Sequence, residues 1–381
     1  MKRISLLAVM SSMLVSGMTT QILAQDCCGS NWSDCCSTSL CDGRFKVGAE
    51  WLYWKGEQDD LSLVLTHSGT TNTTSPDLLT RKTCFVEPNF KYTNGFRVNL
   101  GYELPCNCWE ANVIYTNLPI HASSSLLTAV PSTPNGNGGG PFTLIEPNPV
   151  VAIFRQLSDL FANIGNVNQS FNGGPSYQTF EQKWTLTFNQ IDVDIAKTIS
   201  CNDCISIKPH AGFRAIWYTD TQKATFTGAL PNGGRLGAPT HAFTSDVDLK
   251  NTLKGYGIEA GLWGTWEIGC GLSLLGHFGG SILYAKYRLC EEIATEVTTT
   301  TTVENPVVTV NNYTSDFHDN LHTATPGVDY FLGLQFADDM CDMSFVIRVG
   351  WEQHLYFDTN KIFQAGNLST QGLSLGLEVG F

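Results

Sequence analysis

The strongest constraint on this chain is an alternation of apolar and polar residues that recurs in many segments. In FKYTNGFRVNLGYEL (90–104), every even-numbered residue except Asn94 is apolar, and the odd-numbered residues are polar or Gly. Successive side chains of a β-strand point to opposite faces, so this pattern predicts a strand with one apolar face. The alternation recurs at 45–54, 109–115, 183–199, 205–217, 256–268, 272–284, 328–336, 343–351 and 372–381, which predicts at least ten strands.

The segment 183–199 departs from strict alternation near its middle. One face carries Trp184, Leu186 and Phe188, whereas the opposite face carries Ile191, Val193 and Ile195. An extra residue in a strand shifts the alternation of its side chains. We therefore interpret the switch as a bulge, or as the point where the strand leaves the apolar layer.

The connections between these segments alternate in length. Short turns lie at 105–108, 200–204, 269–271 and 337–341. Long connections lie between them at 55–88, 119–182, 220–252, 290–326 and 358–370. A meander with all its long loops at one end is typical of outer-membrane barrels, whereas a water-soluble sandwich turns its polar face outward. The pattern predicts an all-β, closed antiparallel transmembrane β-barrel with long outer loops.

The final segment, GLSLGLEVGF (372–381), bears on how the sheet closes. No water reaches the hydrocarbon core of a membrane, so a sheet inside it can have no free edge. We therefore expect the last strand to pair with the first, 45–54. Aromatic residues stand near the ends of the apolar rows, as at a membrane interface, at Trp51, Tyr53, Trp109, Trp217, Trp266, Tyr284 and Trp351.

Two long connections contain further strand-like sequence, at 221–247 and 294–310. Each would add a hairpin of two strands, so the minimum is ten strands and we expect about 12 to 16. In the longest connection, residues 148–167 repeat apolar side chains at helical spacing. This helix would either pack on the loops or fold into the barrel mouth and narrow it.

The amino end has the features of a secretory signal in the usual order. Lys2 and Arg3 precede an apolar run at 4–15, and a cleavage site ends at Ala24. We expect a signal peptide at 1–24, a Cys-rich periplasmic leader at 25–44 and the barrel at 45–381. No later segment has the ~18–20 uninterrupted apolar residues of a spanning helix. The predicted location is the bacterial cell outer membrane.

The chain contains thirteen Cys residues. Exported thiols meet an oxidising compartment, and an odd count leaves at least one Cys free or bonded to another molecule. The predicted topology places eleven of them at the short-turn end: Cys27, Cys28, Cys35, Cys36, Cys41, Cys106, Cys108, Cys201, Cys204, Cys270 and Cys341. Cys84 and Cys290 lie at the other end, where they could pair.

These thiols allow three interpretations. Disulfide cross-links to neighbouring molecules and purely internal disulfides are both open. A four-thiolate zinc site at Cys106, Cys108, Cys201 and Cys204 is disfavoured, because exported thiols more often oxidise. We expect neither a metal nor a cofactor.

The polar rows of the strands should face the lumen of the barrel. Arg97, Arg214 and Arg348 fall near strand centres, and Glu50 and Glu259 lie on the same inward rows. These five residues are the candidate pore lining, because charged side chains bias which ions pass. Alternatively, they pair across strands and hold the barrel in shape.

Two functions fit such a barrel. One is a porin that allows passive diffusion of small hydrophilic solutes and ions, and the alternative is a structural envelope protein or adhesin anchored by the barrel. No enzyme is expected, because only His210 and His277 of the eight His lie within strands and no Ser-linked motif accompanies them. A net charge of −13 disfavours binding to nucleic acid.

The segment FKVGAEWLYWKGEQDDLSLVL (45–65) resembles the start of the Legionella-type major outer membrane porin family. The Cys content is similar to that of the major outer membrane proteins of chlamydiae and their relatives. The closing strand, which ends in Phe381, resembles the signal that the barrel assembly machinery recognises. The resemblance implies a general diffusion porin in outer-membrane lipid, either a homo-oligomer or disulfide-linked to its neighbours.

Overall fold

The computed structural model describes residues 43–70, 82–105, 108–127, 141–147, 176–202, 204–230, 240–300, 308–340, 343–361 and 366–381. The predicted signal peptide, nearly all of the leader and the predicted helix at 148–167 lie outside these residues. All regular structure in the described part of the chain is β. No helix there has the length and hydropathy needed to cross a membrane.

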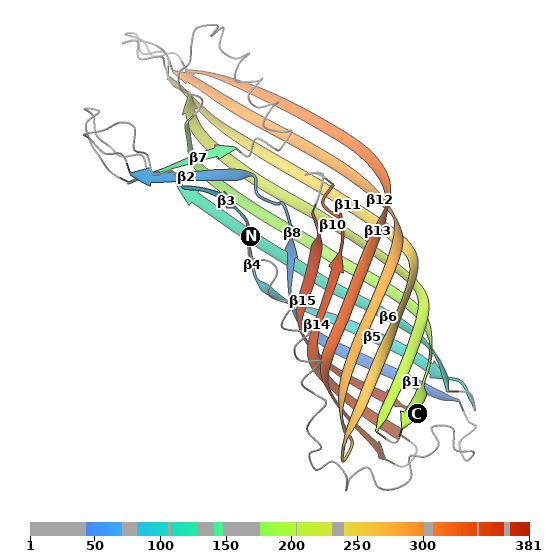
Figure 1. The fold of residues 1–381 in the computed structure, drawn as a ribbon. Helices are drawn as coiled ribbons and strands as arrows, with labels where there is room; N and C mark the ends of the chain where they lie inside the picture. Colours follow the sequence, from blue (N-terminus) through green and yellow to red (C-terminus); the bar gives the residue numbers. More distant parts are fainter. Residues whose placement is uncertain are drawn as a thin grey trace.

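Ten strands form a ring in which each is antiparallel to the next (Figure 1). They are β1 (Arg44–Gln58), β5 (Tyr92–Glu103), β6 (Trp109–Leu127), β8 (Ser176–Lys197), β10 (Ile205–Leu230), β11 (Thr240–Gly269), β12 (Leu272–Thr300), β13 (Val308–Met340), β14 (Met343–Tyr356) and β15 (Leu368–Gly380). Five short strands join them: β2 (Val64–Thr70), β3 (Lys82–Val86), β4 (Asn89–Phe90), β7 (Pro141–Pro147) and β9 (Ile199–Asn202).

The last strand closes the ring on the first, which confirms the prediction from the final segment. β1 and β15 pair from Lys46↔Gly380 to Gln58↔Leu368. Beyond them, the backbones of Phe45 and Phe381 exchange two hydrogen bonds of 2.9 Å each. The terminal aromatic residue is therefore part of the seam and leaves no free edge within the membrane.

The ring has the minimum number of strands counted from the sequence, and the expectation of 12 to 16 is wrong. The strand-like segments at 221–247 and 294–310 add no hairpins to the ring. Their described residues lengthen β10, β11, β12 and β13. The pairing of β10 with β11 therefore extends to Leu230↔His241, and that of β12 with β13 to Thr300↔Val308, far beyond the predicted spanning segments. Alternation shows that a segment is a strand, but an additional strand and an extension of an existing strand have the same period.

The turn between β11 and β12 shows how tightly the chain reverses at the short-turn end. Gly269, Cys270 and Gly271 all have positive φ, of 133°, 54° and 77°. A Cβ on Gly271 would lie 2.4 Å from the carbonyl oxygen of Ala337, so this position admits only glycine without a shift of the backbone.

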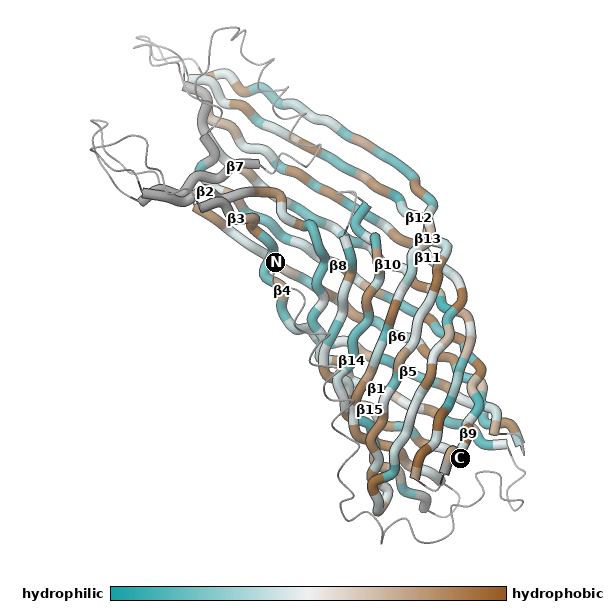
Figure 2. The backbone as a smooth tube through the Cα atoms, in the orientation of Figure 1, coloured by the Kyte–Doolittle hydropathy of each residue, from teal (hydrophilic) through white to brown (hydrophobic). Residues whose placement is uncertain are grey.

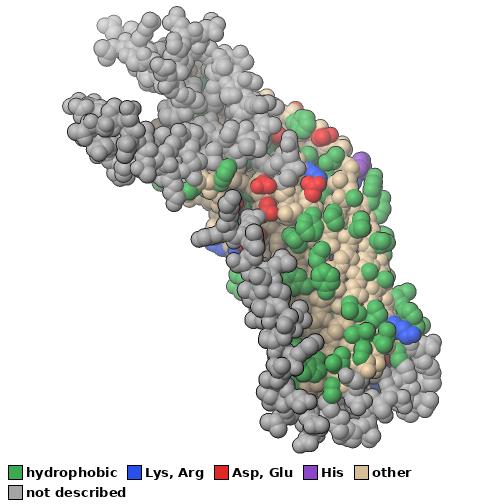
Figure 3. All heavy atoms as spheres, in the orientation of Figure 1, with side chains coloured by type: hydrophobic (Ala, Val, Ile, Leu, Met, Phe, Trp, Pro, Cys, Tyr) green, Lys and Arg blue, Asp and Glu red, His purple; other side chains and the backbone are tan. Residues whose placement is uncertain are grey.

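The half of the barrel nearest the short turns exposes its apolar rows. Ile258 is 68% exposed and Leu377 is 50% exposed, which fits side chains that face lipid. Trp51, Trp351, Tyr256 and Tyr284 are exposed at the outer limit of this belt, and Trp109, Trp266 and Phe381 at its inner limit. Figure 3 shows hydrophobic side chains over this surface and acidic side chains nearer the long-loop end.

The two faces of the sheet exchange polarity at the outer limit of the belt. In the spanning part of β8, Asp192 and Asp194 are buried inside while Val193 and Ile195 are exposed outside. Farther out along the same strand, Trp184 points inward and is fully buried. The tube coloured by hydropathy in Figure 2 shows the alternation continuing along the long strands.

The irregularity in 183–199 is therefore not a bulge. β8 keeps one register with β6 from Trp109↔Lys197 to Leu127↔Thr179, and its even-numbered residues face inward throughout. What changes is the environment of that inner face, as the strand leaves the lipid belt.

An apolar cluster, here called the upper core, fills the barrel beyond the belt. Eight ring strands contribute to it, and its largest buried side chains are Trp54, Trp184, Tyr218, Tyr287 and Tyr356. The inside of the barrel is thus largely apolar where the outside meets water, and polar where the outside meets lipid.

Candidate functional site: the charged lumen

A cavity of about 1040 Å³ occupies the barrel within the lipid belt. Its lining extends from Gly271 and Ala337 at the short-turn end to Arg97 and His354 beneath the upper core. All five predicted pore-lining residues lie on it: Glu50, Arg97, Arg214, Glu259 and Arg348. Their side chains point inward because they lie on the rows opposite the lipid-facing residues.

Arg97, on β5, lies at the centre of one ion-pair cluster. Its guanidinium donates to Glu50 Oε2 on β1 at 2.9 Å and to Glu352 Oε1 on β14 at 2.8 Å. Arg348 Nη2 lies 3.0 Å from Glu378 Oε2 and 3.5 Å from Glu50 Oε1. The cluster links both neighbours of the β1–β15 seam, so it supports the point where the ring closes.

Arg214, on β10, lies at the centre of a second cluster on the other side of the lumen. Its guanidinium is 2.8 Å from Asp192 Oδ1, 2.5 Å from Glu259 Oε2 and 2.7 Å from Asp329 Oδ1. Four strands, β8, β10, β11 and β13, are joined through this one buried side chain. Three carboxylates around one guanidinium leave the cluster with excess negative charge.

Two imidazoles lie beside the Arg214 cluster. His210 Nε2 is 3.0 Å from His277 Nε2, and His277 Nδ1 is 3.4 Å from Asp329 Oδ2. Because two facing ring nitrogens need one proton between them, one accepts and the other donates.

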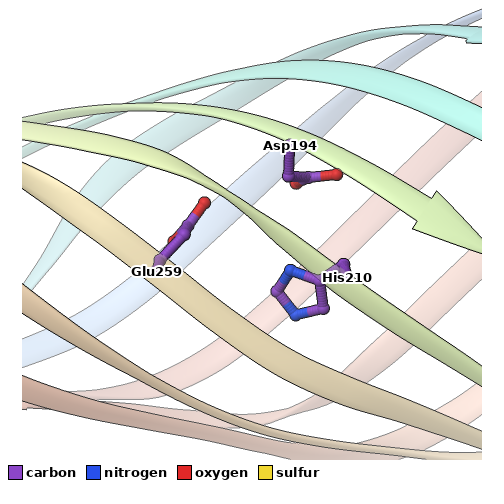
Figure 4. Close-up of side chains that lie close together, drawn as sticks. All are labelled: Asp194, His210 and Glu259. Carbon is purple, nitrogen blue, oxygen red and sulfur yellow. The ribbon is translucent and has the colours of Figure 1, made fainter.

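Asp194, His210 and Glu259 are the described residues best placed to hold a cation (Figure 4). One ligand atom from each lies within 4.8 Å of the others. Imidazole and carboxylate groups are the ligands of many divalent metal sites. In this arrangement, however, the Arg214 guanidinium contacts Glu259 and already supplies positive charge.

A third cluster lies nearer the short turns. Glu110 Oε2 accepts hydrogen bonds from Lys46 at 3.0 Å and from Lys208 at 2.8 Å. Lys46 is also 3.2 Å from Glu103. These contacts join β1, β5, β6 and β10 across the inner end of the cavity.

The cavity lining is acidic as a whole. Ten acidic side chains line it: Glu50, Glu110, Asp192, Asp194, Glu259, Glu267, Asp329, Asp338, Glu352 and Glu378. Five basic side chains line it: Lys46, Arg97, Lys208, Arg214 and Arg348. Such an excess of one charge in a confined space raises the local concentration of counter-ions, here cations.

Asp192 and Asp194 were absent from the candidate pore lining predicted from the sequence. The signal was present, since both alternate with the lipid-facing Ile191, Val193 and Ile195.

The described Cys residues lie at the two ends of the barrel. Cys108, Cys201, Cys204 and Cys270 are at the short-turn end, and Cys84 on β3 and Cys290 on β12 are at the other. Cys201 and Cys290 carry free thiols, so the Cys84–Cys290 pair that the sequence allowed is not formed. The remaining candidates lie outside the described residues: Cys27, Cys28, Cys35, Cys36, Cys41, Cys106 and Cys341.

Residues 40–379 match the model of a protein family described as the Legionella pneumophila major outer membrane protein precursor. No curated protein matches the sequence.

Several solved structures are similar to this chain. The outer membrane protease OmpT of Escherichia coli is 12% identical over 91% of this chain and 100% of its own, with a TM-score of 0.39. A major outer membrane protein of Thermus thermophilus is 10% identical over 89% of this chain and 100% of its own, with a TM-score of 0.27. A FadL homologue of Pseudomonas aeruginosa is 9% identical over 89% and 90%, with a TM-score of 0.23.

Proposed function

This chain belongs to the Legionella major outer membrane protein family and lies in the bacterial outer membrane, and on that premise we propose that its barrel is a channel for small hydrophilic solutes and ions. The observation that carries the proposal is the charged cavity within the lipid belt. A barrel that served only as an anchor needs no water-accessible, ionised space across the hydrophobic part of the membrane.

Cations are the preferred solutes in this proposal. Acidic groups on the cavity lining outnumber basic ones, and rings of carboxylates favour the passage of cations. At one level of this lining, Arg97 contacts Glu50 and Glu352, whose strands lie at the seam or beside it.

Conductance in planar lipid bilayers tests the proposal. The purified full chain should give discrete openings, and a salt gradient should give a reversal potential of the sign expected for cations. A bilayer that stays closed under every condition would overturn the proposal.

A second candidate is a structural envelope protein with the barrel as its anchor. The packed upper core favours it, because Trp54, Trp184 and Tyr356 are buried where an open pore would hold water. This candidate predicts a closed bilayer together with an envelope that loses mechanical strength when the protein is absent.

We also propose that the protein is disulfide-linked to its neighbours or forms a homo-oligomer. The thiol of Cys201 is free and exposed at the short-turn end, where it can reach another molecule. Non-reducing electrophoresis of isolated envelopes should show bands larger than the monomer that collapse on reduction. A monomer band alone contradicts cross-linking.

We propose that the lumen has no catalytic role. His210 contacts His277, and His277 also contacts the carboxylate of Asp329. A hydrolysis assay of peptide and ester substrates with the purified protein should give only background rates.

A further inference from the structure

We propose that two inward-folded segments, 59–63 and 358–360, form a gate that closes the outer end of the lumen. The inference rests on the proposed channel function and describes how that channel would be regulated. The two segments are called the first and second arm below. The first leads from β1 into β2, the second lies between β14 and β15, and both have buried residues inside the barrel beyond the lipid belt.

The first arm follows β1. The backbone reverses at Asp60, whose φ is 61°, and the chain then turns inward. Leu61 is 2% exposed and belongs to the upper core, and Leu63 is fully buried in a second apolar cluster farther out. The carbonyl oxygen of Leu61 accepts two hydrogen bonds of 2.9 Å, from Gln182 Nε2 on β8 and Gln222 Nε2 on β10.

The second arm follows β14 and has the same design. The backbone reverses at Asp358, whose φ is 55°, and Thr359 and Asn360 are fully buried. The carbonyl oxygen of Thr359 accepts hydrogen bonds from Asn251 Nδ2 on β11 at 3.2 Å and from the Tyr218 hydroxyl on β10 at 3.5 Å.

The arms are bonded to each other near their hinges. Asn360 Nδ2 donates to the carbonyl oxygen of Asp59 at 3.1 Å, and the Asp59 amide donates to the carbonyl oxygen of Asn367 at 3.0 Å. Asn367 Nδ2 donates to the Asp59 carboxylate at 3.2 Å. The first of these bonds joins the two arms directly, and the other two join the first arm to the residue before β15, so we treat the arms as one gate.

The contacts between the arms and the barrel wall are suited to being broken. Gln182, Gln222 and Asn251 are buried amides on the inner face, and each donates to an arm. Their side-chain oxygens have no hydrogen-bond partner in the described structure. An unpaired buried oxygen on each amide costs free energy, so these contacts hold the arms less tightly than fully paired amides would.

Withdrawal of the arms would remove Leu61 and Thr359 from the space above the charged cavity. The cavity already reaches the short-turn end, where Gly271 lines it. In the proposal, the upper core loses Leu61 when the arms withdraw, and its remaining side chains part to join the cavity to the outer side of the membrane.

Single-channel recording of the full chain in planar bilayers tests the gate. The double variant Gln182→Leu with Gln222→Leu removes both donors to the first arm. Its open probability should rise roughly tenfold or more over wild type, since two ordinary hydrogen bonds shift an equilibrium by about that factor. Gln178→Leu changes the same residue type on β8 at an exposed site, and should leave the open probability unchanged.

Heat-modifiable mobility on a gel checks that each variant is folded. If the double variant fails to fold, Asn251→Leu removes one donor to the second arm and should raise the open probability several-fold. Equal open probabilities in wild type and folded variants overturn the gate and leave the channel intact. No conductance from any folded variant, with deletion of 59–63 included, overturns the channel as well.

Discussion

Asp220 carries an ionisable group into the upper core. It lies on β10 three residues beyond Trp217, on the outer side of the lipid belt, and it is 2% exposed. Burial raises the pKa of this carboxyl from 3.8 to about 7, although the Trp184 and Gln58 side chains beside it act in the opposite direction. The carboxyl is therefore half protonated near neutral pH in the folded protein.

This pKa sets the sign of a pH effect on stability. A carboxyl whose pKa is raised in the folded protein binds its proton more tightly there than in the unfolded chain. Its contribution to the free energy of unfolding is therefore fully present below pH 3.8 and falls as the pH rises to about 7. A shift of about three units at about 1.4 kcal/mol each gives a total of about 4 kcal/mol. About 3 kcal/mol of this should be lost between about pH 5 and pH 8.

The variant Asp220→Asn isolates this contribution, because Asn is nearly isosteric and does not titrate. Urea unfolding in detergent micelles, followed by Trp fluorescence, gives the free energy of unfolding of both proteins across this pH range. Relative to wild type, the free energy of unfolding of the variant should rise by about 3 kcal/mol as the pH goes from about 5 to about 8. Parallel pH profiles for the two proteins would refute the assignment of a buried, proton-binding carboxyl.

Three further predictions use the same unfolding measurement. Arg97→Met leaves the Glu50 and Glu352 carboxylates in the lumen without their guanidinium, and should lower the free energy of unfolding by about 3–5 kcal/mol. High salt should not restore the lost stability. Trp184→Ala opens a cavity in the upper core and should cost about 3–5 kcal/mol, and a loss below ~1 kcal/mol would mean the core is loosely packed. Leu375→Arg places a charge on the lipid-facing row of β15 and should cost about 2–4 kcal/mol, whereas a neutral effect would place that row away from lipid.

Much of the membrane-spanning architecture follows from local pattern. The alternation in 90–104 and 372–381 shows which residues share a face, since strand geometry has a period of two whatever the fold. The inward rows are therefore enough to identify Arg97, Arg214, Arg348, Glu50 and Glu259 as lumen residues. The requirement for a closed sheet in lipid then assigns the last strand to the first.

The pairing of these charges is a property of the closed ring. Arg97 contacts Glu352, which is 255 residues away in the chain, and this contact exists only because β14, β15, β1 and β5 are neighbours at one register. Alternation indicates that both side chains point inward. It carries no information about which residue lies opposite, because that depends on strand number and stagger.

The sequence by itself thus determined the strands, the lipid-facing rows and the closure of the sheet, because each follows from strand periodicity or from the absence of water in the membrane. Only the tertiary structure decided that the ring has ten strands, that the described parts of 221–247 and 294–310 extend ring strands, and that Leu61 packs inside the outer lumen. The physical reason is that the alternation that places Leu52 and Trp54 on one face of β1 is the same whether that face meets lipid, a partner or a packed interior. What surrounds an inward side chain is set by the chain segments that meet it across the barrel.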